Sequence, residues 1–280
     1  MSTAYDKYGN ADGCAMDVAI IVVGDEVLQG FIQDTNTPFL ASRLRELGHR
    51  VRKVTVVPDE MDAIARAVRE ALGSGVGLLL VSGGLGTTPD DMTTEAVAKA
   101  LAVPLRLDKG ALGWIEERVR TRWDSEKQRR SDPAALRRMA MLPEGAAALK
   151  NEAGMAPGIH LRRGSTDIVL MPGVPAELMD LFSKRVEGAI VPRADDGEHF
   201  IELTGHMNET AMHGLLQRLH DEHRDVIVGS YPQERGLVIL RVHGKVKGSV
   251  EAVVAILRRE LGDAINKDSA PEGTICDKPG

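Results

Sequence analysis

The chain has 280 residues and a formal net charge of −6, with 43% hydrophobic, 27% charged and only 3% aromatic residues. These totals are typical of a globular protein with one large domain, or one larger and one smaller domain, and an aliphatic core. They argue against a nucleic-acid platform, which normally combines a basic face with stacking aromatic rings. We therefore expect small-molecule partners and no nucleic acid.

A cytoplasmic location is expected by default, because the sequence shows no membrane span, no secretion signal and no paired cysteine motif. No apolar run approaches the length of about 18 residues that a membrane span needs, so no membrane contact is expected. Residues 1–17 are acidic and polar and lack the apolar core of a secretion signal. Cys14 and Cys276 have no C-x-x-C spacing, which excludes a thiol redox motif and a zinc knuckle.

Strand-like and helix-like segments alternate along the first two thirds of the chain. Strands are expected at 17–24, 49–57, 76–82 and 165–175, and helices at 37–48, 60–73, 92–101, 109–130, from Pro133 onward and at 176–190. Such alternation implies right-handed crossovers and a mostly parallel sheet covered by helices on both faces. The predicted class is therefore α/β.

The polar segment 191–199 contains Pro and Gly and is interpreted as a linker between two domains. Before it, residues 1–15 are expected to be a disordered leader and residues 16–192 the α/β domain. After it, residues 198–265 are predicted to form a small β-α-β-β-α module of the α+β class, and residues 266–280 a loose tail.

The chemistry-bearing loops follow the predicted strands. In an open α/β sheet, ligands bind beyond the carboxyl ends of the strands. The loops there read GDEVLQG, PDE, GGLGTTPDD and PGVPAE, and they contain Asp25, Glu26, Asp59, Asp90 and Asp91. Such carboxylates can hold a hard cation, while glycine-rich backbone N–H groups face a phosphate.

The GGLGTTPDD loop also has plainer interpretations. Its glycines can simply permit a tight turn, and Asp91 can cap the helix that begins at Met92. A Walker motif is excluded because no Gly-Lys-Ser/Thr follows, and the dinucleotide motif G-x-G-x-x-G fails where Pro89 stands. A cap needs only one carboxylate, however, and adjacent like charges cost energy unless a cation or donors neutralise them. The pair Asp90 and Asp91 therefore favours a functional role.

Taken together, four stretches resemble the molybdopterin-binding domain family, and in particular the amino-terminal domain of CinA-type proteins. They read VGDEVLQGFIQDTNTPFLASRLRELG, VSGGLGTTPDDMTTEAVAKAL, LPEGAAALKNEAGMAPGI and MPGVPAEL, in the family's order over about residues 17–190. The resemblance implies a three-layer α/β/α sandwich with the ligand across the glycine-rich loop. The 198–265 module resembles the small domain that follows in CinA-type proteins, and no room is left for the amidase domain of longer members.

The resemblance also implies a set of site residues. It implies that Asp91, Asp90 and Asp59 are the catalytic residues. It also implies that Glu26, Asp59 and Asp91 are the ligands of a divalent metal ion (Mg, Mn or Co). Ligand and phosphate binding falls on Gly83, Gly84, Gly86, Thr87, Thr88, Asp25, Asn36, Asn151, Pro157, Gly158, Pro172, Gly173 and Pro175. Self-association as a dimer or trimer is expected from the same resemblance.

Three positions depart from the family pattern. Thr87 takes the place of a proline, Met139 follows Arg138 where a Gln is frequent, and Met155 stands where a Thr is usual. The Gln and the Thr hydroxyl are two groups that could have formed hydrogen bonds to a ligand.

Three functions are compatible with these loops. The first is metal-dependent hydrolysis of a nucleotide diphosphate such as ADP-ribose or FAD. The second is a molybdopterin-binding factor in molybdenum cofactor biosynthesis, acting in adenylyl transfer or metal insertion. The third is a non-catalytic sensor of a nucleotide or pterin phosphate.

Overall fold

The computed structural model describes residues 14–122, 132–194 and 197–265. The chain divides into two compact units, residues 1–194 and 195–280. The predicted tail, the predicted leader apart from Cys14 and Ala15, and the end of the helix predicted at 109–130 lie outside the described residues.

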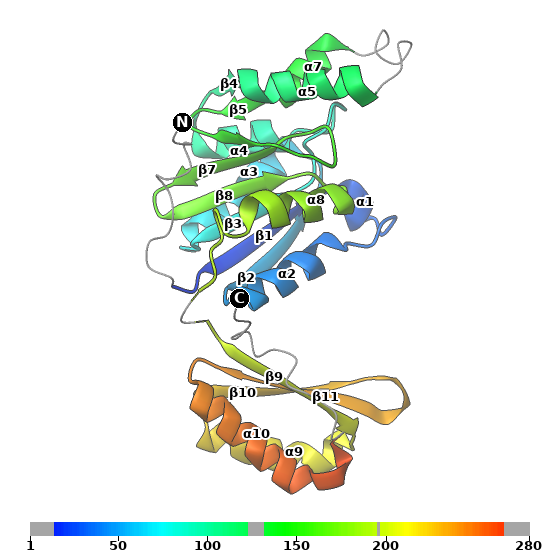
Figure 1. Cartoon of the computed structure of the whole chain (residues 1–280), viewed down its shortest axis with the longest axis vertical. Helices are drawn as coiled ribbons and strands as arrows, with labels where there is room; N and C mark the ends of the chain where they lie inside the picture. The colour runs from blue at the N-terminus through cyan, green and yellow to red at the C-terminus, as the bar shows by residue number, and fades with distance from the viewer. Residues whose placement is uncertain (1–13, 123–131, 195–196, 266–280) are drawn as a thin grey trace. The chain divides into compact units, whose positions relative to one another are not determined.

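A six-stranded sheet forms the centre of the first unit (Figure 1). Its strand order is β2 (Arg50–Val57), β1 (Asp17–Val23), β3 (Leu78–Ser82), β8 (Thr166–Met171), β7 (Gly158–Arg163), β6 (Ala147–Leu149). The first four run parallel, whereas β7 and β6 pair antiparallel. The predicted mostly parallel sheet is therefore confirmed.

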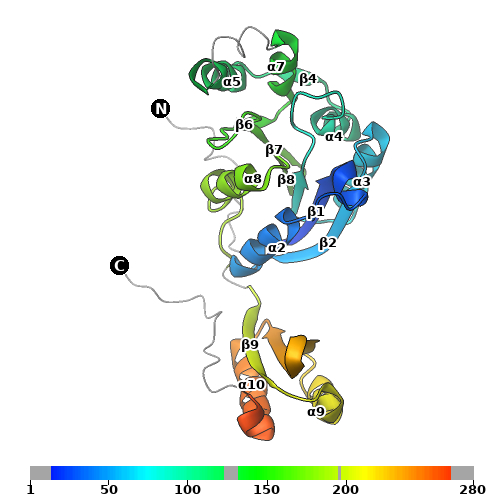
Figure 2. The same cartoon turned by 90° about the vertical axis from the view of Figure 1, so that its right-hand side faces the viewer.

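Helices cover both faces of this sheet, as Figure 2 shows. One face carries α2 (Asn36–Glu46), α8 (Pro175–Leu181) and the π-helical turn η2 (Phe182–Val186). The other carries α3 (Met61–Gly73), α4 (Thr93–Leu101), α5 (Lys109–Arg122) and α7 (Pro133–Met139). The predicted three-layer α/β/α arrangement is confirmed.

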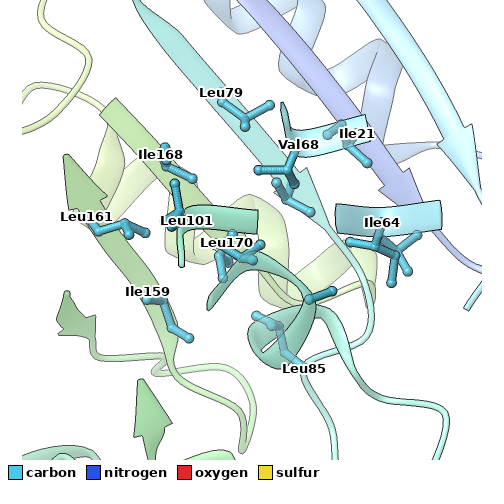
Figure 3. Close-up of a cluster of buried hydrophobic side chains, with 14 of the residues drawn as sticks. Ile21, Ile64, Val68, Leu79, Leu85, Leu101, Ile159, Leu161, Ile168 and Leu170 are labelled. Atoms are coloured by element: carbon cyan, nitrogen blue, oxygen red, sulfur yellow. The ribbon is translucent and has the colours of Figure 1, made fainter. Parts of the chain in front are cut away.

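Strand β1 is apolar almost throughout because both of its faces are buried. Ile21 packs with Ile64 and Val68 of α3 in the cluster drawn in Figure 3, while Ile20 packs with Leu40 of α2 in the opposite layer. The two core layers hold the strands in place, so the loops at their carboxyl ends extend from a rigid scaffold.

Several short elements are not predicted by the sequence pattern. They are α1 (Asp25–Leu28), the pair β4 (Leu105–Leu107) and β5 (Met141–Pro143), the strand β7 and the edge strand β6. Segments of three or four residues are too short to display a period. Pairing with a neighbouring strand decides the short strands among them and also the six-residue β7.

The second unit has the predicted strand–helix–strand–strand–helix order. It contains β9 (His199–His206), α9 (Glu209–Glu222), β10 (Val226–Pro232), β11 (Leu237–Gly244) and α10 (Lys247–Leu261), with 3₁₀ turns at Glu234–Gly236 and Gly262–Ala264. The antiparallel sheet has the order β10-β11-β9. Buried aliphatic side chains such as Leu240 and Leu257 join this sheet to its helices. Among the described helices of either unit, none has the length and apolar character needed to cross a membrane.

We predict that Leu170→Ala lowers the free energy of unfolding by about 2–5 kcal/mol, because the side chain is fully buried between sheet and helices. Leu28→Ala is the matched control: that side chain is 45% exposed, so its loss should change stability by about 0.5 kcal/mol or less. Urea unfolding measures both variants. Equal losses would contradict the assigned core.

Candidate ligand-binding site

A cavity of about 600 Å³ lies where β1, β3 and β8 end. Its volume is in the range of sites that bind small molecules. The predicted site residues that line it are Glu26, Asn36, Asp59, Gly83, Gly84, Gly86, Thr87, Asp90, Asp91, Pro172, Gly173 and Pro175. Loops from distant parts of the sequence therefore meet at the sheet edge that the sequence indicates.

The other predicted ligand residues do not line this cavity. Asp25 donates its backbone N–H to Asp59 Oδ2 (2.8 Å), and Thr88 binds the Asp91 carboxylate. Asn151 and Pro157 line a separate cavity of about 250 Å³. Gly158 packs beneath Leu181, whose Cδ2 would lie 2.5 Å from a Cβ at that position. Local hydrogen bonds hold Asp25 and Thr88, and close packing holds Gly158, away from the cavity; the sequence displays neither kind of contact.

The glycine turn after β3 is required by local geometry. Gly83 has φ 104°, and a Cβ there would lie 2.1 Å from the carbonyl oxygen of Val23. Gly84 has φ 66°, and its Cβ would lie 2.3 Å from Oγ1 of the buried Thr93. Positive φ and this close approach favour glycine at both positions. The tight-turn interpretation is therefore correct for Gly83 and Gly84, whatever the turn binds.

The same turn presents donors to the cavity. Gly83 N–H donates to Met171 O (3.0 Å). Within the described residues, the N–H groups of Gly84, Leu85 and Gly86 make no hydrogen bond, and all three residues line the cavity. Successive amides of this kind form a concave site for an anion.

The adjacent carboxylates Asp90 and Asp91 are stabilised by their own loop. Asp91 Oδ2 accepts hydrogen bonds from Thr88 N (2.9 Å) and Thr88 Oγ1 (2.5 Å). The Thr88 hydroxyl, with the backbone N–H of Asp90 as a second cause, also lowers the pKa of Asp90. Asp91 does not cap α4, whose N-cap residue Met92 makes no side-chain cap bond. The helix-cap interpretation of Asp91 is therefore wrong: this carboxylate closes a loop.

Arg138 of α7 holds this loop from outside. Its guanidinium donates from Nη1 to Thr88 O (3.1 Å), from Nη2 to Asp91 O and from Nε to Glu95 Oε1 (2.7 Å). A planar guanidinium with several donors suits this multiple contact. Arg138 therefore positions the acidic pair without lining the cavity itself.

Asp59 lies among other carboxylates. Burial, followed by repulsion from Glu26, Asp25 and Asp90, raises the pKa of Asp59, although the Asp25 N–H opposes this shift. Glu26 itself fits over Gly24, where a Cβ would lie 2.7 Å from Glu26 Oε1. Carboxylates from three different loops thus concentrate negative charge on one side of the cavity.

The predicted metal ligands Glu26, Asp59 and Asp91 do not form a complete metal site by themselves. Across the described parts of the chain, no three His, Cys, Asp or Glu side chains form a group that could hold a metal ion. Mg²⁺ is commonly bound by one or two carboxylates together with phosphate oxygens of a substrate and water. The carboxylates that line the cavity fit this mode of binding, in which protein side chains would supply only part of the cation's ligands.

Asn36 joins three walls of the cavity. Its Nδ2 donates to Ser82 Oγ (3.0 Å) at the end of β3 and to Gly173 O (2.8 Å) after β8. Asp34 Oδ1 accepts the N–H of Asn36 (3.0 Å), which fixes the start of α2. The side chain is only 7% exposed, and its Oδ1 has no partner within the described residues. Because the Gly173 carbonyl can only accept, it fixes which end of the amide faces it.

Sequence reasoning missed several lining residues. Ser82, Asp34 and Glu177 line the cavity beside predicted positions. Leu136, Met139 and Met155 form an apolar side. The departures at Met139 and Met155 mark two of these positions, but only the packing of α7 and the 151–156 loop brings them together.

Comparison with known proteins agrees with this geometry. Residues 19–191 match the family described as "Probable molybdopterin binding domain". A protein of Archaeoglobus fulgidus is 32% identical over 249 residues, which cover 89% of this chain and 99% of that protein. A protein of Metallosphaera sedula is 43% identical over 159 residues; these cover 57% of this chain and 58% of that relative, so the match spans little more than half of it.

Among solved structures, the protein CinA of Thermoplasma acidophilum, described as having unknown function, is 36% identical with a TM-score of 0.54. The superposition covers 60% of this chain and 95% of that one. With its α/β/α fold and its cavity at the glycine turn, the chain belongs to the molybdopterin-binding domain family. Within that family it is CinA-like.

We predict that Asn36→Ala lowers the free energy of unfolding by about 1–3 kcal/mol, because it removes a buried donor from Ser82 and Gly173. Thr35→Ala is the matched control, since this exposed neighbour makes no side-chain cap bond and should cost about 0.5 kcal/mol or less. Denaturant unfolding gives both values; an Asn36→Ala loss no larger than that of the control would refute the joining role.

A second prediction concerns pH. Because the pKa of Asp59 in the folded protein lies above its ordinary value of 3.8, the stability conferred by its protonated form is present below that value. It is lost as the pH rises through the raised pKa. Asp59→Asn, whose amide oxygen can still accept the Asp25 N–H, should therefore gain stability over the parent as the pH rises.

Asp62→Asn provides a control of opposite sign. A hydrogen bond and charge attraction from Lys99 lower the pKa of Asp62, so its stabilising contribution is present above the ordinary value and is lost as the pH falls. Urea unfolding of both variants at about pH 3.5 and about pH 7 compares them. The same direction of change in the two variants would show that the charge around Asp59 is misassigned.

Proposed function

We propose that this protein binds a nucleotide diphosphate such as ADP-ribose or FAD in the cavity and hydrolyses its diphosphate in the presence of Mg²⁺, Mn²⁺ or Co²⁺. One observation carries the proposal: unpartnered amides of the glycine turn and carboxylates from three loops line the same cavity. Amides suit phosphate oxygens, and carboxylates suit a cation that accompanies the phosphate.

Each part of the cavity has a role in this scheme. The N–H groups of Gly84, Leu85 and Gly86 donate to the oxygens of the phosphate that stays bound. Glu26 and Asp91 would hold the divalent cation. When bound there, a divalent cation supplies neutralisation of the charge that develops on the phosphoryl oxygens.

Asp59 is the proposed general base. A carboxyl group with a raised pKa is a stronger base, whereas the lowered pKa of Asp90 makes that residue a weaker one. Asp59 accepts a proton from water while the water oxygen forms a bond to phosphorus. The bond from phosphorus to the bridging oxygen breaks, and the departing phosphate takes the electron pair. The Asp25 N–H orients the carboxylate through its Oδ2.

The second candidate is a molybdopterin-binding factor in molybdenum cofactor biosynthesis, which the family match over residues 19–191 favours. The same amides would then hold the terminal phosphate of the pterin. Binding of molybdopterin without turnover of any nucleotide diphosphate would support this candidate over hydrolysis.

We predict that the full chain hydrolyses ADP-ribose or FAD when one of the three cations is added, and that Asp59→Asn lowers kcat by about 10²–10⁴-fold with little change in binding. Asp62→Asn is the matched control and should retain turnover, because Asp62 is an exposed carboxylate on α3 that does not line the cavity. Product detection by chromatography and calorimetric binding give the two readouts.

The outcomes separate the candidates. Binding without turnover in the parent protein rules out hydrolysis of the diphosphates tested and leaves a carrier or sensor role. Absence of binding by every nucleotide diphosphate and by molybdopterin would overturn the assigned cavity.

A further inference from the structure

The cavity has a second, apolar side that the phosphate chemistry does not use. Leu136 and Met139 come from α7, and Met155 and Ala156 come from the loop before β7. Met139 is 7% exposed, and Leu136 and Met155 pack against the same core layer. We define these four residues as the apolar wall.

The apolar wall is held rigidly beside the phosphate-binding turn. Arg138, next to Met139, binds the carbonyls of Thr88 and Asp91, so α7 and the acidic loop are fixed to one another. The position of Met139 relative to the glycine turn is therefore determined by a contact of its neighbour.

The loop that carries Met155 is equally constrained. Asn151 Oδ1 accepts the N–H groups of Ala153 (3.0 Å) and Gly154 (2.8 Å), and its Nδ2 donates to Ala156 O (2.9 Å) and Glu177 Oε2 (2.7 Å). Arg118 Nη2 donates to the carbonyl of Asn151 (2.7 Å), which ties the loop to α5. Asn151 is thus a positioning residue for the wall, although it does not line the cavity.

The chemistry of the wall indicates how it recognises a ligand. None of its four side chains can form a strong hydrogen bond, whereas methionine sulfur makes favourable contacts with aromatic rings and adapts its shape. A site that uses hydrogen bonds rejects a wrong ring strongly, but an apolar site discriminates only weakly. The wall therefore fits a planar ring system without reading its edge.

We propose that the apolar wall is a ring subsite, so that the ligand must combine a diphosphate with a heteroaromatic ring while the identity of that ring matters little. This inference rests on the proposed function, because it assumes that the phosphate lies at the glycine turn. It deepens that function by defining the substrate class as nucleoside diphosphate derivatives of several bases rather than one nucleotide.

The first test measures the affinity of the full chain for ADP-ribose, its guanine counterpart and inorganic pyrophosphate, each with Mg²⁺, by calorimetry. The two ring-bearing compounds should bind within about 10-fold of each other, because apolar contacts discriminate weakly. Pyrophosphate, which lacks a ring, should bind about 10-fold or more weakly than either, since stacking contributes to affinity.

Met155→Ala should weaken the binding of both ring-bearing compounds by about 10-fold and leave pyrophosphate unchanged, because only the ring contact is removed. Met155→Leu keeps the volume and should retain most of the affinity. Met179→Ala, a partly buried methionine of α8 outside both cavities, is the matched control and should have no effect on any compound. Thermal unfolding verifies that each variant is folded; if Met155→Ala is not, the three-compound comparison alone decides.

The two proposals fail in different ways. Binding of pyrophosphate as tight as that of ADP-ribose, or a preference of more than about 100-fold for one ring, would overturn the ring subsite while leaving the phosphate site intact. Failure of all three compounds to bind would instead refute the proposed function.

Discussion

The close approach of the turn after β3 to the end of β1 is the constraint on which the rest of the site depends. Gly83 lies so near the carbonyl of Val23 that no side chain fits between them. Thr93 then binds the carbonyls of Gly83 and Gly84 through its hydroxyl (2.8 Å) and its N–H (3.1 Å). The chain therefore leaves the strand in one direction only, and the following amides face the cavity.

Three polar contacts convert this turn into a complete pocket. Thr88 holds Asp91, Arg138 holds the loop that both residues occupy, and Asn36 ties the end of β3 to the loop after β8. Each contact adds a hydrogen bond to a backbone carbonyl or a carboxylate. The pocket is therefore preorganised by contacts within the protein, two of which come from Thr88 and Arg138, residues that do not line the cavity.

Carboxylates, backbone amides and apolar side chains all line this pocket. Glu26 and Asp59 concentrate negative charge near amides that attract anions, and the proposed binding of a phosphate together with a divalent cation would neutralise both. Met139 and Met155 close the other side without polar groups. The cavity thus suits a molecule with a charged end and an apolar, planar end.

The sequence by itself determined the layers of the fold and the edge of the sheet that carries the cavity. Runs such as residues 18–23 are apolar at every step because two helical layers cover them, and this pattern is readable without coordinates. The tertiary structure alone decided which loop residues line the cavity. Thr88 and Asn151 turn toward Asp91 and Glu177, and Met139 and Met155 come together only when α7 docks. Direction and contact between distant segments depend on packing, which a linear pattern does not encode.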